Sequence, residues 1–374
     1  MILRELILTN FKNIESARLE FSPKINCFLG DNGMGKSNLL DALYFLSFCK
    51  SFTGAQDGML VRRGESFAML RGRYARRGLD EEVAAAVQPG HRKSFKRSGK
   101  PYKRLAEHIG AFPLVLLSPA DMSLVGGEPA ERRRFIDQII SQRDAPYLDA
   151  LLRYNHALEQ RNKLLKQENG DNTLFDALEA QLEIAANYIS RQRKANIARL
   201  QEIFTPYYQA IADCSEDARL RYTGNDYSDE GGLAEHLRAM RQRDRLLRFT
   251  ASGPHRDDIE FSLDSMPVKR SASQGQTKTF TSALRFAQYE LLRESLGLNP
   301  LLLLDDIFDK LDAGRVRRIM ALVGGSGTFG QIFITDTNRK HLDEIVADIP
   351  GSDAGGAYRL WHVEQGVFST IEQQ

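Results

Sequence analysis

The stretch Gly30-Asp31-Asn32-Gly33-Met34-Gly35-Lys36-Ser37 constrains the fold more than any other part of the sequence. It fits the pattern G-x-x-x-x-G-K-[ST], in which backbone N–H groups and the positive end of a helix dipole surround a phosphate. An apolar run at 25–29 predicts a buried strand before it, and leucines at helical spacing in 38–48 predict a helix after it. The order of strand, loop and helix favours an α/β fold, whereas the alternative is a glycine turn without a ligand.

Within this loop, each residue type has a chemical reason. Lys36 would reach the β- and γ-phosphates of a nucleotide, and the Ser37 hydroxyl would bind Mg²⁺. A matching acidic group comes from Leu301 to Asp306, where four leucines end in two carboxylates. Ligands of parallel sheets bind at the carboxyl ends of the strands, so Asp305 is the candidate Mg²⁺ ligand and Asp306 the candidate to orient an attacking water. The alternative is a strand that ends in a polar turn.

Composition describes an ordinary globular protein of 374 residues, long enough for two or three domains. With 51 Lys and Arg against 49 Asp and Glu, the net charge is only +2, so a nucleic-acid partner must be argued from local patches. Cys27, Cys49 and Cys214 lie far apart, which argues against a disulfide framework or a thiolate zinc site. No signal peptide or membrane-spanning run is evident, and we expect a cytoplasmic protein with no membrane partner.

The clearest basic patch lies between Arg62 and Arg104, where thirteen Lys and Arg face four Asp and Glu. Strands are expected at 66–74 and 81–87, followed by a hairpin that turns at Ser98-Gly99. One interpretation is a surface that neutralises DNA phosphates, with nearby aromatic residues available for packing or stacking. The other is a solvated face of an antiparallel sheet, because Lys and Arg also protect exposed strand edges.

From Pro129 to about Ala212 the chain is expected to be helical, with breaks near 144–146 and 169–172. A further strand at 220–223 and a helix at 233–249 would return the chain to the first domain. We therefore expect a phosphate-loop domain made of residues 1–118 and 250–374, which we call the head, with an inserted helical arm at 119–249. Arg132-Arg133-Arg134 sits near a helix start, where the side chains meet either a phosphate, an acidic partner or solvent.

A third stretch, Ser273-Gln274-Gly275-Gln276, precedes a helical segment at 277–296, and Ser273 is a reasonable N-cap. Together with the phosphate loop, the acidic strand end and Lys310-Leu311-Asp312 in D-loop spacing, it resembles the ABC-type ATPase heads of the DNA-repair branch. The closer resemblance is to the bacterial RecF family. It rests on these motifs and on four further stretches, namely 8–13, 117–122, Arg132 to Asp137, and Gly253 to Asp258.

The resemblance implies an α/β ABC-type ATPase head with an antiparallel β subdomain and an inserted helical arm. It further implies an ATP-dependent homodimer, in which Ser273, Gly275 and Gln276 of one subunit contact the γ-phosphate held by the other. RecF proteins act in DNA replication, recombination and the SOS response; they bind double-stranded DNA at gaps and help RecO and RecR to load RecA. A weak, DNA-stimulated ATPase activity with ATP and Mg²⁺ would serve as a release switch.

Two departures from the general ABC pattern affect these expectations. Asp306 stands where most ABC heads have Glu, which shortens the reach to water by about 1.5 Å and predicts slow hydrolysis. After the strand at 332–334 the usual switch histidine is absent, and Thr335-Asp336-Thr337 stands in its place. His255 is the nearest substitute, although a histidine in a Gly-Pro turn is more often structural.

Two other classes of protein share part of this pattern. An ABC module that energises a membrane transporter would carry the same nucleotide motifs, but the helical insertion of about 120 residues and the lack of a coupling signature argue against it. A small-molecule P-loop kinase would need no signature helix.

Overall fold

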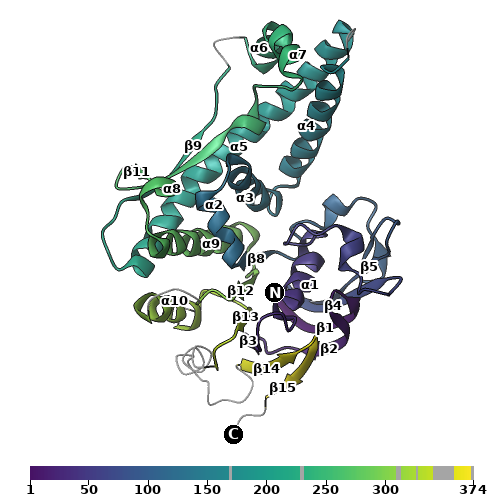
Figure 1. The fold of residues 1–374 in the computed structure, drawn as a ribbon, viewed down its shortest axis with the longest axis vertical. Coiled ribbons are helices and arrows are strands. Elements are labelled where there is room, and N and C mark those ends of the chain that lie inside the picture. Colours follow the sequence, from purple (N-terminus) through teal and green to yellow (C-terminus); the bar gives the residue numbers. More distant parts are fainter. Residues whose placement is uncertain (168–170, 228–230, 309–312, 326, 340–357, 372–374) are drawn as a thin grey trace. The chain divides into compact units, whose positions relative to one another are not determined.

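The computed structural model describes residues 1–167, 171–227, 231–308, 313–325, 327–339 and 358–371, which belong to two compact units (Figure 1). Unit 1 comprises Met1–Asp121, Tyr207–Cys214 and Gln274–Gln374, and unit 2 comprises Met122–Pro206 and Ser215–Ser273. Residues 250–273, which we expected in the head, thus group with unit 2. The reason is strand pairing, since 258–263 forms an antiparallel ladder with 218–223.

Unit 1 contains a mostly parallel sheet in the order β15-β14-β3-β13-β12-β8. Its strands are β3 (Ile25–Leu29), β8 (Leu114–Leu117), β12 (Leu301–Asp305), β13 (Ile332–Asp336), β14 (Tyr358–Glu364) and β15 (Val367–Thr370). Only β15 runs antiparallel to its neighbour. β8, β12 and β13 are buried along their whole length, as expected of parallel strands covered on both faces. The expected strands at 25–29, 301–304 and 332–334 are confirmed.

A second sheet of unit 1 is antiparallel, in the order β2-β1-β4-β5-β6-β7. Its strands are β1 (Ile2–Phe11), β2 (Ile14–Glu20), β4 (Ala68–Arg76), β5 (Leu79–Val87), β6 (Ser94–Arg97) and β7 (Lys100–Pro101). Ser98 and Gly99 both have positive φ, 46° and 79°, which is the conformation of a type I′ hairpin turn. The predicted antiparallel insertion and its turn are confirmed.

Helix α1 (Lys36–Phe48) joins the two sheets of unit 1. It contacts β4 and β5 of the antiparallel sheet and β8, β12 and β13 of the parallel one. Because both sides of the helix are covered, nearly all of its residues from Leu39 onward are buried. One apolar cluster therefore runs through both sheets, and α1 is fixed firmly at the end of the phosphate loop. Helices α9 (Gln274–Leu296) and α10 (Ala313–Gly325) complete the unit, and α9 contacts β8.

Unit 2 is mainly helical. Its helices are α2 (Met122–Gly126), α3 (Pro129–Ser141), α4 (Ala145–Leu164), α5 (Asn172–Ala212, up to Pro206), α6 (Leu233–Ala239), α7 (Arg241–Leu247) and α8 (Val268–Ser271). A small sheet has the order β11-β10-β9, with β9 (Ala218–Thr223), β10 (Asp258–Leu263) and β11 (Met266–Pro267). The expected start at Pro129 and the break near 144–146 are confirmed. The break expected at 169–172 lies largely outside the described residues; α4 ends before it, at Leu164, and α5 begins at Asn172. The single helix expected at 233–249 is instead two helices that meet at Met240.

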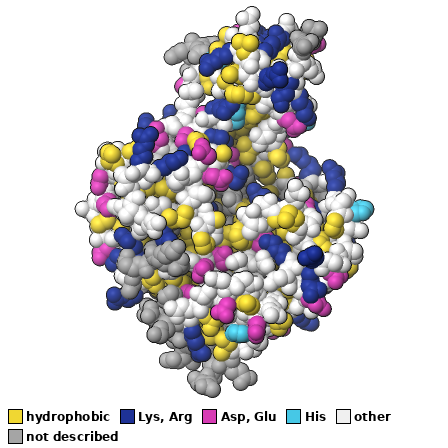
Figure 2. Space-filling view, viewed as in Figure 1, with side chains coloured by type: hydrophobic (Ala, Val, Ile, Leu, Met, Phe, Trp, Pro, Cys, Tyr) yellow, Lys and Arg dark blue, Asp and Glu magenta, His cyan; other side chains and the backbone are white. Residues whose placement is uncertain are grey.

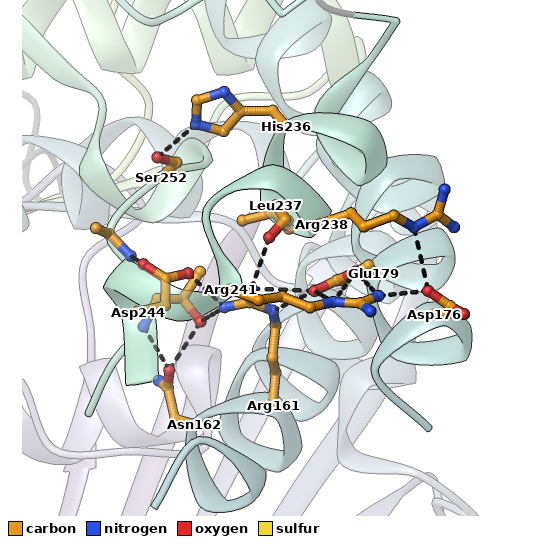
Figure 3. Close-up of polar contacts among 12 residues, drawn as sticks. Arg161, Asn162, Asp176, Glu179, His236, Leu237, Arg238, Arg241, Asp244 and Ser252 are labelled. Carbon is orange, nitrogen blue, oxygen red and sulfur yellow. Dashed lines mark hydrogen bonds and ion pairs between the residues drawn. The ribbon is translucent and has the colours of Figure 1, made fainter. Parts of the chain in front are cut away.

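A buried polar network links α4, α5 and α7 within unit 2 (Figure 3). Arg161 of α4 is fully buried and pairs with Glu179 of α5 at 3.0 Å and with Asp244 of α7 at 2.7 Å. Its guanidinium also donates to Thr250 Oγ1 and to the Leu237 carbonyl oxygen. All three charged groups are thus desolvated but compensated, which is the condition under which burial of charge is tolerated.

We predict that Arg161→Met strongly destabilises unit 2, because Glu179 and Asp244 would lose a shared buried counter-ion. The expected cost is about 3–5 kcal/mol. Arg153→Met is the matched control, since Arg153 lies on the same helix and pairs with Asp149, yet its side chain is 78% exposed. It should cost less than about 1 kcal/mol. Denaturant unfolding with hydrogen exchange of α4 and α7 measures both, and equal losses in the two variants would contradict the prediction.

Candidate functional site

The phosphate loop joins β3 to α1, and three of its positions have a backbone conformation or a close contact that favours glycine. Gly33 and Gly35 have φ of 82° and 114°, in the region where a Cβ is disfavoured. A Cβ on Gly30 would lie 2.2 Å from the carbonyl oxygen of Val363 in β14. Gly35 is the N-cap of α1, so the backbone turns directly from the loop into the helix N-terminus that favours anions.

Two hairpin turns hold the loop from outside. Asn13, in the turn between β1 and β2, donates from Nδ2 to the carbonyl oxygen of Met34 and accepts at Oδ1 from Asn38 of α1 at 2.8 Å. Gly366, in the turn between β14 and β15, donates its backbone N–H to the same Met34 oxygen at 2.8 Å. The sequence analysis missed this second turn, although Gln365-Gly366 between the apolar residues Val363 and Val367 was an available signal.

Lys36 is pre-positioned beneath the loop. Its side chain is buried, and Nζ donates to the carbonyl oxygens of Gly30 and Asp31. Burial lowers the pKa of Lys36, while the negative charges of Asp306, Asp305 and Asp31 act in the opposite direction. The Lys36 ammonium group can replace its hydrogen bonds to these carbonyl oxygens with bonds to phosphate oxygens. It is therefore suited to bind a polyphosphate.

Asp305 connects the loop to the end of β12. Its Oδ1 accepts hydrogen bonds from Ser37 Oγ at 2.9 Å and from Thr335 Oγ1 at 2.7 Å. Burial raises the pKa of this carboxyl, and the two hydroxyl donors and Lys36 partly oppose the shift. The structure thus brings Lys36, Ser37 and Asp305 together from sequence positions about 270 residues apart.

Asp306 adopts a left-handed backbone with φ of 48°, unusual for a residue other than glycine. Its backbone N–H donates to both the carbonyl oxygen and the hydroxyl oxygen of Thr335, at 3.1 and 3.2 Å. Positive φ at a non-glycine residue stores strain of about 1–3 kcal/mol and commonly marks a functional position. Thr335 therefore fixes both neighbouring acids, a role that sequence reasoning missed when it noted only the absent histidine.

The signature stretch lies on another element of the chain. Ser273 is exposed and immediately precedes α9, and Gly275 and Gln276 are in the first turn of that helix. A Cβ on Gly275 would lie 2.5 Å from Nη1 of Arg315 in α10, so the glycine allows this arginine to lie against the helix start. Lys310-Leu311-Asp312, expected to form a D-loop, falls outside the described residues.

Several residues of the other motifs are internal supports of unit 2. Arg132 forms a bidentate pair with Asp258 at 2.7 and 2.9 Å, and Arg133 donates to the carbonyl oxygen of Asp257. His255 is partly buried, and its ring lies between the Tyr154 hydroxyl at 2.6 Å and the Thr250 carbonyl oxygen at 3.0 Å. Burial lowers the pKa of His255 to about 4, so the ring is neutral near pH 7. The two arginines are therefore engaged within the fold rather than available to a phosphate.

The basic patch of 62–104 is partly neutralised by acids of the antiparallel sheet and of the neighbouring turn at Asp57. Glu81 pairs with Arg76 and Arg97, and Lys93 pairs with Asp57 at 3.0 Å. The aromatic side chains Tyr74 and Phe95 are buried, so they pack in the core and do not offer a stacking surface. Exposed cations outside the ion pairs of the described residues are found on and beside the β6–β7 hairpin; they are Arg92, Lys96, Lys100 and Lys103.

Loss of the Thr335 hydroxyl should weaken the site. Thr335→Val keeps the shape of the side chain but removes a donor from buried Asp305 and an acceptor from the Asp306 N–H. We expect a loss of about 1–3 kcal/mol in the free energy of unfolding and weaker Mg²⁺-dependent nucleotide binding. Thr335→Ser keeps the hydroxyl and should retain most of both properties. Equal behaviour of Val and Ser variants in chemical denaturation and nucleotide titration would contradict this role.

Comparison with known proteins places this geometry in a family. Residues 2–350 match the model of the RecF/RecN/SMC N terminal domain. Two relatives named DNA replication and repair protein RecF, from Parabacteroides distasonis and Bacteroides fragilis, are each 46% identical, with 100% of both chains covered. Across the part of the chain that is described, no helix is long and apolar enough to cross a membrane.

Solved structures agree with the sequence relatives. A structure of the recombination mediator protein RecF-ATP in the RecFOR pathway superposes with a TM-score of 0.87 at 28% identity, covering 99% of this chain and 98% of that one. An Smc head domain from Pyrococcus furiosus, at 19% identity and a TM-score of 0.58, shares the fold. The expected ABC-type α/β head is confirmed, and the chain belongs to the RecF family of DNA replication and repair proteins.

Proposed function

We propose that this protein is an ATP-dependent DNA-binding factor of recombinational repair, which dimerises on ATP and binds double-stranded DNA at gaps. In this proposal it assists RecO and RecR in loading RecA, and slow ATP hydrolysis releases it. The observation that carries the proposal is the contact between Ser37 Oγ and Asp305 Oδ1, because it joins the two halves of a nucleotide site. The names of the relatives support the DNA partner, and they give no support to a transporter module. A cytoplasmic location is part of the proposal.

The residues of the loop fit a nucleotide with Mg²⁺. Positive-φ glycines and the start of α1 provide backbone N–H groups for phosphate oxygens, and Lys36 supplies the cation. Ser37 and Asp305 offer the hard oxygen ligands that Mg²⁺ takes together with phosphate and water. When bound, the ion would neutralise phosphate charge. Lys36 would exchange its loop carbonyls for the β- and γ-phosphates.

Asp306 is the proposed group for water activation. Its backbone is fixed by Thr335, so its carboxylate has little freedom to compensate for a side chain shorter than Glu. If the base does not reach the attacking water, the water and the phosphate are poorly aligned, and hydrolysis is slower. We therefore propose a slow ATPase, stimulated when DNA improves the alignment.

Dimerisation is proposed to complete the site. Ser273, Gly275 and Gln276 surround a helix N-terminus, which is suited to a γ-phosphate presented by a second subunit. ATP would then be part of the interface, and association would depend on nucleotide by mass action.

Lys36→Met should weaken ATP binding at least about tenfold, because one charge-assisted contact to phosphate is worth about 1.5–3 kcal/mol. Lys24→Met is the control, since Lys24 is an exposed lysine that immediately precedes β3. Titration with a fluorescent ATP analogue measures both variants. Unchanged affinity in Lys36→Met would remove the phosphate-loop assignment.

Ser273→Arg should preserve ATP binding by each monomer and prevent ATP-induced dimerisation. The long cation would fill the space that a partner's γ-phosphate needs, while leaving the monomer's own loop intact. Gel filtration with light scattering, with and without ATP and a duplex, tests the dimer and the DNA partner together. Dimers of Ser273→Arg that form with ATP as in the wild type would refute the cross-subunit site.

Duplex DNA binding by the β6–β7 hairpin should depend on the Lys and Arg side chains that form no ion pair among the described residues. For duplex DNA, the slope of log K against log salt is about −0.9 per neutralised phosphate. Reversal of charge at Arg92 and Lys96 should therefore flatten the slope by about 1.8. Lys93→Gln is the control and should leave the slope unchanged, because Lys93 is already paired with Asp57. A slope unaffected by the double reversal would place duplex binding elsewhere.

A further inference from the structure

Asp336 is a buried acid at the carboxyl end of β13. It is 2% exposed, and its Oδ1 accepts a hydrogen bond from the backbone N–H of Asn338 at 2.8 Å. The turn after the strand therefore holds this carboxylate in place. The hydroxyls of Ser37 and Thr335 donate instead to Asp305, the candidate Mg²⁺ ligand. The two buried acids at the ends of neighbouring strands are thus positioned by different groups.

Strand register places Asp336 between the two halves of the nucleotide site. β13 lies between β3 and β12 in the parallel sheet. On one side Asp336 pairs with Leu29, which immediately precedes the phosphate loop. On the other side Thr335 pairs with Asp305, so Asp336 comes one residue beyond that level. Since ligands of such sheets bind at the carboxyl ends of the strands, a terminal phosphate held by the loop would lie beside Asp336.

Four carboxylates act electrostatically on the lysine of the phosphate loop. Burial lowers the pKa of Lys36, and these four acids oppose the shift; they are Asp306, Asp305, Asp31 and Asp336. Side chains of both signs are interspersed on the face drawn in Figure 2, and the net charge of the chain is only +2. Groups at the site, rather than the protein as a whole, therefore set the potential that a bound phosphate meets.

We propose that Asp336 disfavours the γ-phosphate, and so lowers the affinity of a single subunit for ATP relative to ADP. An ionised carboxylate only accepts hydrogen bonds, so Asp336 cannot donate to a phosphate oxygen. When Lys36 exchanges its loop carbonyls for phosphates, the charge of Asp336 stays beside the γ-phosphate, and like charges repel more strongly where water is excluded. ADP lacks the γ-phosphate and the charge that Asp336 repels most.

This repulsion makes stable ATP binding depend on the second subunit. In the proposed dimer, the N-terminus of a partner's α9 presents the positive end of a helix dipole to the γ-phosphate, which offsets the negative charge of Asp336. A subunit alone then holds ATP weakly, and the closed dimer holds it well. The inference rests on the proposed function and adds a specificity-determining residue to the same site.

Asp336→Asn tests the repulsion, because it removes the charge and keeps an Oδ1 acceptor for the Asn338 N–H. Dissociation constants of the full-length protein for ADP and for the slowly hydrolysed analogue ATPγS are measured with Mg²⁺ by isothermal titration calorimetry. Protein concentrations are those at which light scattering shows a monomer with either nucleotide. The Asn variant should bind ATPγS at least about fivefold more tightly and ADP within about twofold of the wild type. Asp336→Glu keeps the charge and should not tighten ATPγS binding.

Glu364→Gln is the matched control. β14 lies on the other side of β3, and its His362 pairs with the same Leu29 that pairs with Asp336. Glu364 is the last residue of β14 and is exposed, so solvent screens its charge. Loss of this carboxylate should leave the affinities for ATPγS and ADP unchanged. The comparison separates the buried acid beside the loop from an exposed acid at the end of the opposite neighbouring strand.

A second measurement follows the dimer. Asp336→Asn should lower the ATPγS concentration that gives half-maximal dimerisation, by light scattering, by the same factor as it lowers the dissociation constant. Asp336→Ser, also uncharged, should reproduce both shifts if the Asn variant does not fold. Equal gains for ATPγS and ADP, or unchanged or weaker ATPγS binding in the uncharged variants, overturn the proposal. If the wild type binds neither nucleotide, the proposed function itself is overturned.

Discussion

The candidate site depends on one carboxylate oxygen, Oδ1 of Asp305, which accepts from both Ser37 and Thr335. Strand order explains why. β13 lies between β3 and β12, so the phosphate loop and the acidic strand end are not neighbours in the sheet. Thr335 is paired in register with Asp305 on one side and Phe28 on the other, and its hydroxyl donates to Asp305 Oδ1. The Ser37 hydroxyl reaches the same oxygen from the phosphate loop. Thr335 therefore positions Asp305 from the strand that lies between the two halves of the site.

Unit 2 is held together by buried charge pairs rather than by apolar packing alone. Arg161, Arg193 and Arg132 each bind carboxylates from distant segments, and the separation in sequence reaches 126 residues for Arg132 and Asp258. Buried pairs of this kind contribute little net stability but strongly penalise any arrangement that leaves one charge alone. They therefore favour one packing of the helices of unit 2, and they give the motif residues Arg132 and Asp258 a structural role within that unit.

Much of this fold and site could be predicted from local patterns, because the backbone conformation of a loop, turn or strand end depends mainly on a few neighbouring residues. The loop Gly30 to Ser37, the acidic end of β12 and the turn at Ser98-Gly99 each depend on neighbouring residues. What could not be predicted depends on distant pairing. Glu81 neutralises Arg97 across two strands, and the turn at Gly366 supports Met34 from the other end of the chain. Neither the periodicity nor the composition of the sequence shows which carboxylate forms an ion pair with which Lys or Arg in the fold.

The inability to predict distant ion pairs matters most for predicting which surfaces are charged. With a net charge of +2, the total field of the protein says little about an anionic partner. Folding divides the cations into those that meet a carboxylate, such as Lys93 and Arg241, and those that do not, such as Lys96 and Arg243. Paired surface charges produce a weak field beyond the Debye length, whereas unpaired ones exert their full charge on a nearby phosphate. Under the proposed function, a DNA-binding surface is therefore defined less by where lysine and arginine are abundant than by where acids are missing.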